Sequence, residues 1–274
     1  MICTHSKNYH KGIKFCTVCG AFLSSSGSKT IREQEFLSEL HFSPKDVLNE
    51  LRDLQRFNRF SMSSPYLLYR KVLIEWIFEI GESLNVKVLT IHSAIYIMDT
   101  SLSTIDIPVV QYQGVALISL VIASKCEELI DDALEIKDIA RFTKIPYNRL
   151  KQIELEVLDS IDWRAHRATP LHFLEFYISV GCVFDSDTIK TKDKSKAVRN
   201  VRKYSQFFAD LCLQESSFLV YSAEELALSF IASGRKVLNI EPLWSSELTE
   251  LTQTNLNLEC CEKMYSLYSQ QFLG

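Results

Sequence analysis

The sequence predicts an all-α protein, and three observations support this prediction. Only 8 glycines and 6 prolines occur in 274 residues, which is few for a loop-rich β fold. Apolar residues recur at helical spacing along several stretches. One run, from Tyr112 to Glu128, is apolar on almost every side, as is typical of a helix at the centre of a bundle. Because 47% of the residues are hydrophobic, we expect sizeable cores and two domains of ordinary size.

Residues 1–23 differ from the rest because they are rich in metal-binding side chains. Two cysteines two residues apart form a turn that can offer both thiolates to one tetrahedral zinc ion. A Cys-x-His pair precedes them, and His10 is the alternative to its histidine. The competing interpretation is a flexible tail with unrelated thiols and imidazoles. We predict a zinc knuckle that folds with its metal, and its ligands would be Cys3, His5, Cys16 and Cys19.

A flexible Ser-rich linker is predicted over residues 24–43, and a helix over residues 44–61. Ser43 is suited to cap this helix, and Pro44 suits its first position. One face of the helix is apolar.

Residues 66–165 are predicted to form five short helices. We expect the first to end near Gly81 and the second to be capped by Thr90 and ended by Asp99 and Ser101. The third is the apolar run, which we expect to be too short for a bilayer that needs roughly 20 residues. The expected ranges of the second to fifth helices are 92–102, 112–128, 132–142 and 147–161.

The third helix ends in a polar sequence, Ser124-Lys125-Cys126-Glu127-Glu128. One interpretation is a solvated helix end, with Lys125 placed favourably near the negative end of the helix dipole. The other is a polar site for a partner.

Residues 168–274 carry a second helical pattern. Thr169 caps and Pro170 opens its first helix. A polar run over residues 185–195 predicts a loop. Ser222 and Glu225 form a capping box at the start of a helix that would be the centre of this half. The later helices are expected at 196–214, 222–238, 245–255 and 257–272.

Charge and termini limit the possible partners. The formal net charge is −4, which disfavours nucleic acid as the main partner. Neither a signal peptide nor a membrane-spanning run is evident, so we expect an intracellular protein, in the nucleus, the cytoplasm or both.

The 8 cysteines of an intracellular protein should be reduced. Those interpreted as small buried or half-buried side chains are Cys126, Cys182, Cys212, Cys260 and Cys261.

Three motifs in order resemble the cyclin box of the cyclins that activate cyclin-dependent kinases. They are the run Arg70-Lys-Val-Leu-Ile-Glu-Trp-Ile77, the run Leu120-Val-Ile-Ala-Ser-Lys-Cys-Glu-Glu128, and Glu154 to Leu158 with Trp163. Residues 168–176 resemble the opening of the second cyclin repeat. The resemblance implies two consecutive five-helix cyclin-box domains, over residues 66–165 and 168–274.

The resemblance also implies which residues bind a partner. Lys125 and Glu154 match the charged pair with which cyclins hold the regulatory helix and activation segment of the kinase. The residues expected to form the apolar part of that interface are Ile122, Cys126, Leu155, Leu158 and Trp163. Cys126 departs from the family, because many cyclins have an aromatic residue there.

A groove that docks kinase substrates or inhibitors is the second site that the resemblance implies. The residues that match it are Tyr69, Val72, Leu73, Trp76 and Gln113. Tyr69 stands where the family usually has Met, and Val109 where Arg is common. The alternative is that Tyr69 and Trp76 simply belong to the core.

Three classes of function compete. The first is a cyclin, a regulatory subunit that activates a cyclin-dependent Ser/Thr kinase. The second is a general transcription factor of the B type, which also joins a zinc ribbon to two cyclin folds and binds promoter DNA and polymerase. The third is an enzyme, which we disfavour because no phosphate loop, paired carboxylates or activated nucleophile is evident. His92, His166 and His172 are scattered and are interpreted as structural.

Overall fold

The computed structural model describes residues 43–189 and 193–272. The chain separates into two units, residues 1–47 and 48–274, and the packing reported below lies within the second. In the described residues there are eleven α-helices and no β-strand, so the predicted all-α fold with two five-helix domains is confirmed. The predicted zinc knuckle, with Cys3, His5, His10, Cys16 and Cys19, lies outside the described residues.

Helix α2, Pro44–Gln55, starts as predicted, because Ser43 Oγ accepts a hydrogen bond from the Asp46 amide at 3.2 Å. It ends before residue 61, where the sequence analysis placed its end. The segment beyond it is bonded elsewhere: Asn58 Nδ2 donates to the carbonyl oxygen of Ala168 at 2.9 Å, and Arg167 donates to that of Phe57. These bonds tie the segment to the linker between the two five-helix folds.

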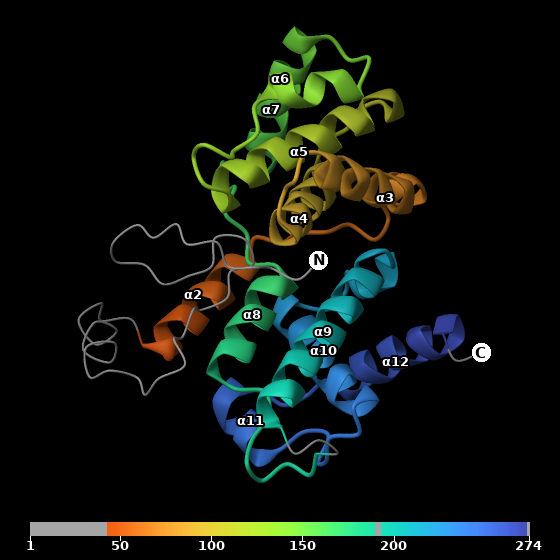
Figure 1. Ribbon diagram of the computed structural model, residues 1–274. Helices are drawn as coiled ribbons and strands as arrows, with labels where there is room; N and C mark the ends of the chain where they lie inside the picture. The colour runs from red at the N-terminus through yellow and green to blue at the C-terminus, as the bar shows by residue number, and fades with distance from the viewer. Residues whose placement is uncertain (1–42, 190–192, 273–274) are drawn as a thin grey trace. The chain divides into compact units, whose positions relative to one another are not determined.

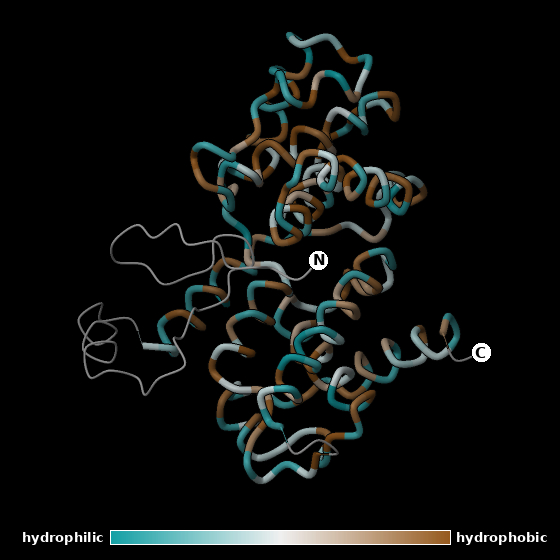
Figure 2. Tube along the Cα trace, viewed as in Figure 1, coloured by the Kyte–Doolittle hydropathy of each residue, from teal (hydrophilic) through white to brown (hydrophobic). Residues whose placement is uncertain are grey.

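The first fold is built around α5, Tyr112–Glu127, which packs against α3, α4 and α7 (Figure 1). Every residue from 114 to 124 of α5 is buried, which confirms its central place. Hydrophobic residues gather toward α5 in Figure 2. The other helices of this fold are α3, Leu67–Ser83; α4, Val88–Thr104; α6, Ile136–Ile139; and α7, Tyr147–Ser160.

Two helices of the first fold differ from expectation. α4 begins at Val88, so Thr90 lies inside the helix and does not cap it. Asp99 and Ser101 are buried within α4 and do not end it. The helix predicted over residues 132–142 is only the short α6, followed by a 3₁₀ turn at Ala140–Phe142.

The apolar run around α5 is longer than the sequence analysis assumed. Within the described residues, Val109–Glu127 is long and apolar enough, by length and composition, to cross a membrane. The expectation that the run is too short is therefore wrong. Burial accounts for its composition, because 61% of its most apolar window is covered by the rest of the protein, as in a core helix.

The second fold is built around α10, Ala223–Val237, which contacts α8, α9 and α12. Both predicted caps are confirmed: Thr169 and Ser222 each form a capping box at the starts of α8 and α10. Four of the five described cysteines are buried as expected, whereas Cys126 is exposed. The other helices are α8, Pro170–Val180; α9, Lys194–Leu213; α11, Ser246–Thr252; and α12, Leu258–Phe272.

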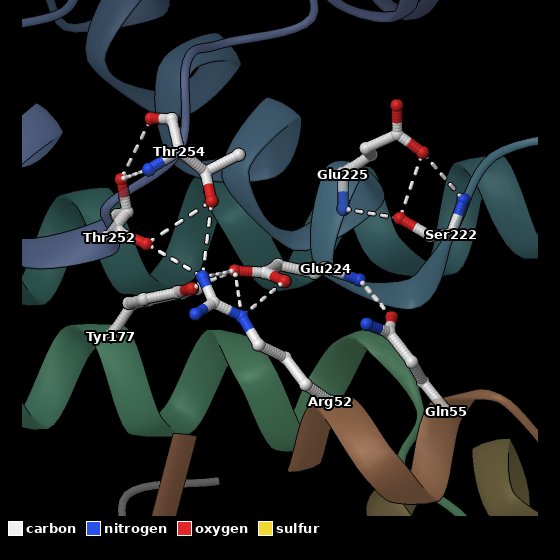
Figure 3. A network of polar contacts seen from close by, with 8 residues as sticks. All are labelled: Arg52, Gln55, Tyr177, Ser222, Glu224, Glu225, Thr252 and Thr254. Carbon is white, nitrogen blue, oxygen red and sulfur yellow. Dashed lines mark hydrogen bonds and ion pairs between the residues drawn. The ribbon is translucent and has the colours of Figure 1, made fainter. Parts of the chain in front are cut away.

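Helix α2 precedes the first fold in the chain but packs on the second. Leu48 is buried in the core of the second fold. Arg52 reaches Glu224 at the start of α10 with an Nη2 to Oε1 distance of 2.6 Å, and also donates to the Thr252 carbonyl at 2.8 Å (Figure 3). Tyr177 of α8 donates to the same Glu224 carboxylate at 2.6 Å. One buried carboxylate therefore joins α2, α8 and α10.

Polar contacts also link the two folds to each other. Arg70 Nη1 of α3 donates to the carbonyl oxygen of Leu213 in α9 at 2.7 Å. His92 Nε2 of α4 lies 3.0 Å from Asp210 Oδ1 of α9. The two folds are thus held by side chains of the first fold that reach α9.

Candidate functional site

Lys125 and Glu154 form an ion pair on the surface of the first fold. Lys125 stands in the last turn of α5, and Glu154 lies on α7, which packs against α5. The distance from Lys125 Nζ to Glu154 Oε1 is 2.7 Å, and the side chains are 51% and 20% exposed. A pair this exposed adds at most about 1 kcal/mol to stability, so the fold does not depend on it. Both side chains remain accessible to a partner.

Two apolar residues expected at the same surface face solvent. Leu155 is 54% exposed and Trp163 is 62% exposed. The Trp163 indole donates to Asp159 Oδ1 at 2.8 Å, which fixes the ring next to α7. Exposed large apolar residues on one helix and the turn after it are typical of a protein-binding surface.

The other residues expected at this surface are placed differently. Leu158 is half-buried, and Ile122 is only 3% exposed, so Ile122 belongs to the core beneath the surface. Cys126 is exposed on the last turn of α5. Partial burial and the neighbouring Glu127 carboxylate raise the pKa of the Cys126 thiol, which therefore stays neutral at neutral pH.

The two glutamates at the end of α5 are engaged inside the protein. Glu127 accepts a hydrogen bond from Ser93 Oγ at 2.9 Å and lies 3.2 Å from His172 Nε2 of the second fold. Glu128 accepts from the Lys87 amide at 2.9 Å and from Thr90 Oγ1 at 2.6 Å. The hydrogen bond from the Lys87 amide lies at the start of α4. Among the charged residues of the stretch Ser124 to Glu128, only Lys125 forms an ion pair with α7 and is exposed to solvent.

Two exposed residues that sequence reasoning missed follow α5 directly. Leu129 is 55% exposed and Ile130 is 95% exposed. They lie in a polar context, Glu128-Leu129-Ile130-Asp131-Asp132, where two adjacent apolar residues in a loop were the available signal. They add two exposed apolar side chains after the end of α5.

A buried polar cluster was also missed. Arg70 of α3 donates from Nη2 to Asp99 Oδ2 of α4 at 2.8 Å, and both side chains are at most 2% exposed. Tyr66 donates to Asp99 Oδ1 at 2.6 Å. Arg70 and Asp99 are far apart in the sequence, so no spacing pattern predicts that they pair. Through the Leu213 carbonyl, Arg70 also carries the link to the second fold.

The predicted docking groove is exposed only in part. Tyr69 is 43% and Val72 is 67% exposed, and Gln113 is exposed at the start of α5. Trp76 is half-buried, and Leu73 is 6% exposed and belongs to the core. Tyr69 stacks edge-on against Tyr112 with ring centroids 5.7 Å apart. Further exposed apolar residues on these segments are Leu68, Val109 and Val110.

No metal centre is evident in residues 43–189 and 193–272, where no three His, Cys, Asp or Glu side chains are grouped to hold an ion. The zinc prediction concerns other residues and stays a prediction.

The comparisons with known proteins agree with this architecture. Residues 47–166 match the family model "Cyclin, N-terminal domain", and residues 168–272 match "Cyclin, C-terminal domain". The chain is 26% identical to Cyclin-J of Xenopus laevis over 73% of its own length and 55% of that protein. It is 30% identical to Cyclin-D of Ostreococcus tauri, over 68% of its length and 51% of that protein.

A solved structure, that of a viral cyclin from herpesvirus saimiri, shares the fold. Its TM-score is 0.62 at 14% identity, with 82% of this chain and 98% of that chain covered. At this identity the likeness concerns the fold alone. Two consecutive five-helix folds, each matched by its own family model, define a cyclin-box protein. The chain belongs to the cyclin family. It spans about half the length of these curated relatives.

Proposed function

We propose that this chain binds and activates a cyclin-dependent Ser/Thr protein kinase, and that it acts as a regulatory subunit without a catalytic site of its own. Membership of the cyclin family supports this proposal. The observation that carries it is the accessible Lys125–Glu154 pair, at 2.7 Å, flanked by the exposed Leu155 and Trp163. Such a protein would work inside the cell, where its kinase is found.

The proposed mechanism uses a rigid surface to hold a mobile kinase element. Lys125 and Glu154 stand on two helices that pack against each other, so their charges are fixed before the partner arrives. Polar groups held in this way can bind the regulatory helix and activation segment of the kinase. The helix would then stay where its glutamate pairs with the lysine that positions ATP.

The apolar residues around the pair supply the remaining contact area. Leu155, Trp163, Leu129 and Ile130 are each more than half exposed in the free chain, so binding would remove apolar surface from water. Cys126 offers less area than the aromatic residue common in the family. We therefore propose that Trp163 is the main anchor of this interface.

A substrate-docking role is proposed for the surface of α3 and α5 that carries Tyr69, Val72 and Gln113. The exposure of Tyr69 and Val72 supports it. The alternative of a B-type transcription factor receives no support, because the relatives reported above are cyclins.

The test is a charge swap that preserves the internal pair. The double variant Lys125→Glu, Glu154→Lys keeps one cation next to one anion but reverses both charges seen by a partner. We expect the tagged wild-type chain to co-purify from a eukaryotic cell extract with a Ser/Thr kinase active on histone. The double variant should lose roughly 2–5 kcal/mol of binding free energy, and with it that activity.

The matched control swaps another surface pair, Glu135→Lys with Lys137→Glu. These side chains are 64% and 67% exposed at a distance of 3.0 Å. We expect this control to bind the kinase as the wild type does. A kinase that is retained equally by both double variants would contradict the proposed site, and polymerase subunits in its place would contradict the proposed function.

A further inference from the structure

Three of the largest fully buried side chains are arginines: Arg70, Arg167 and Arg235. Two of them are neutralised inside the protein. Arg70 pairs with Asp99 at 2.8 Å, and Arg235 pairs with Asp187 at 2.7 Å. Such pairing is what a buried charge requires, because removing an ion from water is costly unless an opposite charge compensates for it.

Arg167 is the exception. It is 1% exposed, yet no carboxylate in the described part of the chain lies within ion-pair distance of its guanidinium group. Its Nη1 donates to the Phe57 carbonyl, and its buried Nε has no hydrogen-bond partner among the residues that the structure describes. A water molecule could satisfy the Nε–H group but would not neutralise the charge. Within residues 43–189 and 193–272, this buried cation therefore has no counterion.

Two further arginines repel the positive charge of Arg167. Burial, repulsion by Arg59 and repulsion by Arg164 together lower the pKa of Arg167 to about 10, and only Asp162 opposes them. Arg164 lies over the Phe57 ring, with its guanidinium carbon 4.1 Å from the centroid. Two guanidinium groups of the linker before α8 thus contact Phe57: that of Arg164 lies over its ring, and that of Arg167 donates to its carbonyl oxygen. Arg59 follows Phe57 by two residues, and its charge also acts on Arg167.

The cluster is open to solvent on one side. Arg59 and Arg164 are exposed, whereas Arg167 is buried. Neither exposed arginine has a carboxylate within ion-pair distance among residues 43–189 and 193–272. An anion from solvent can therefore reach the two exposed guanidinium groups directly, whereas the buried Arg167 acts on it through its charge.

We propose that Arg59, Arg164 and Arg167 form a binding site for a phosphate group, either free or as the monoester of a phosphorylated side chain. Three guanidinium charges against the single carboxylate of Asp162 leave an excess of two, which a phosphate near its dianionic state neutralises. A carboxylate carries a single negative charge and would leave one positive charge without compensation. The planar guanidinium forks also match the oxygens of a phosphate group. This inference does not depend on the kinase partner.

The test uses the full-length chain and exposed residues, whose substitution leaves the core intact. Calorimetric titration with sodium phosphate, and with a short Gly/Ser peptide carrying one phosphoserine, should detect binding. Arg59→Gln and Arg164→Gln should each weaken it about tenfold, since a hydrogen bond to a charged group is worth roughly that much. Arg141→Gln is the matched control, because Arg141 is also exposed and lies over an aromatic ring, that of Phe142, at 4.9 Å.

Arg167→Met tests the buried member through stability. Phosphate should raise the melting temperature of the wild type more than that of Arg167→Met or of the Arg59→Gln, Arg164→Gln double variant. The variants are the reference, because phosphate also stabilises proteins by exclusion from the surface. Tighter binding of the phosphopeptide than of free phosphate, with no binding of the unphosphorylated peptide, would identify a phosphorylated side chain as the source. Equal binding would identify free phosphate. Binding that survives in the double variant, or that the wild type lacks, would overturn the proposal.

Discussion

Arg70 and Asp99 are buried together, and this determines what happens when one of them is removed. The Arg70→Met variant leaves the Asp99 carboxylate without its cation in a site that is 0% exposed. We expect a loss of about 3–5 kcal/mol in the free energy of unfolding, because an uncompensated buried charge is costly. Urea denaturation at neutral pH measures this loss.

An exposed pair gives the control for that measurement. Arg56 Nη1 lies 3.1 Å from Asp53 Oδ1, and the two side chains are 76% and 62% exposed. Solvent screens such a pair, so Arg56→Met should cost no more than about 1 kcal/mol. Equal losses in the two arginine variants would mean that burial of the Arg70–Asp99 pair does not govern its contribution.

Leu155 allows the proposed kinase interface to be tested without a change of charge. Leu155→Ala removes apolar surface that is 54% exposed, so the free energy of unfolding should change by less than about 0.5 kcal/mol. Binding to the kinase should weaken by about 1 kcal/mol or more if the residue is buried there. Leu258→Ala on α12 is the matched control, since Leu258 is 63% exposed. Surface plasmon resonance compares the two variants, and equal affinities would place the interface elsewhere.

At the scale of helices, local sequence signals explain what could be predicted. The apolar run predicted α5 to within one residue at its C-terminal end, because a central helix is apolar all round. Ser222 and Glu225 predicted the start of α10 because both halves of a capping box lie close together in the sequence. The prediction of a helix over residues 132–142 was wrong, because a short apolar stripe does not distinguish one turn of helix from three.

The cap of α10 can be tested directly. Ser222 Oγ accepts from the Glu225 amide at 3.2 Å, and Glu225 Oε2 accepts from the Ser222 amide at 2.9 Å. Ser222→Ala removes the first bond and should destabilise the protein by about 1 kcal/mol. Ser222→Asp restores an acceptor at the cap and should recover most of that loss in thermal denaturation. An aspartate variant as unstable as the alanine variant would contradict the capping role.

At the scale of the whole molecule, the contacts that join the helical folds could not be predicted. Arg52 and Glu224, or His92 and Asp210, are separated by more than a hundred residues, so their meeting depends on the tertiary structure. The carboxylates that pair with Arg70 and Arg235 are 29 and 48 residues away in the sequence, and these pairs also depend on the tertiary structure. The Lys125–Glu154 pair could be proposed only because family motifs carried both positions.

Glu127 and His172 provide a pH-dependent link between the two folds. Burial raises the pKa of Glu127, but the His172 imidazole, whose Nε2 lies 3.2 Å away, and the hydrogen bond from the Ser93 hydroxyl outweigh it, so the pKa lies below the ordinary value of 4.5. A depressed carboxylate pKa means that the ionised form stabilises the folded state. This contribution is fully present above the unfolded value of 4.5 and is lost as the pH falls through the folded pKa.

The variant Glu127→Gln isolates this contribution. At neutral pH we expect it to lower the free energy of unfolding by about 1–3 kcal/mol, as for the loss of a hydrogen bond to a charged group. The difference from the wild type should then shrink as the pH falls below 4.5, because the wild-type carboxyl group becomes protonated as well. Urea denaturation of both proteins across this pH range gives the difference at each point. A difference that stays constant with pH would show that ionised Glu127 does not stabilise the contact between the folds.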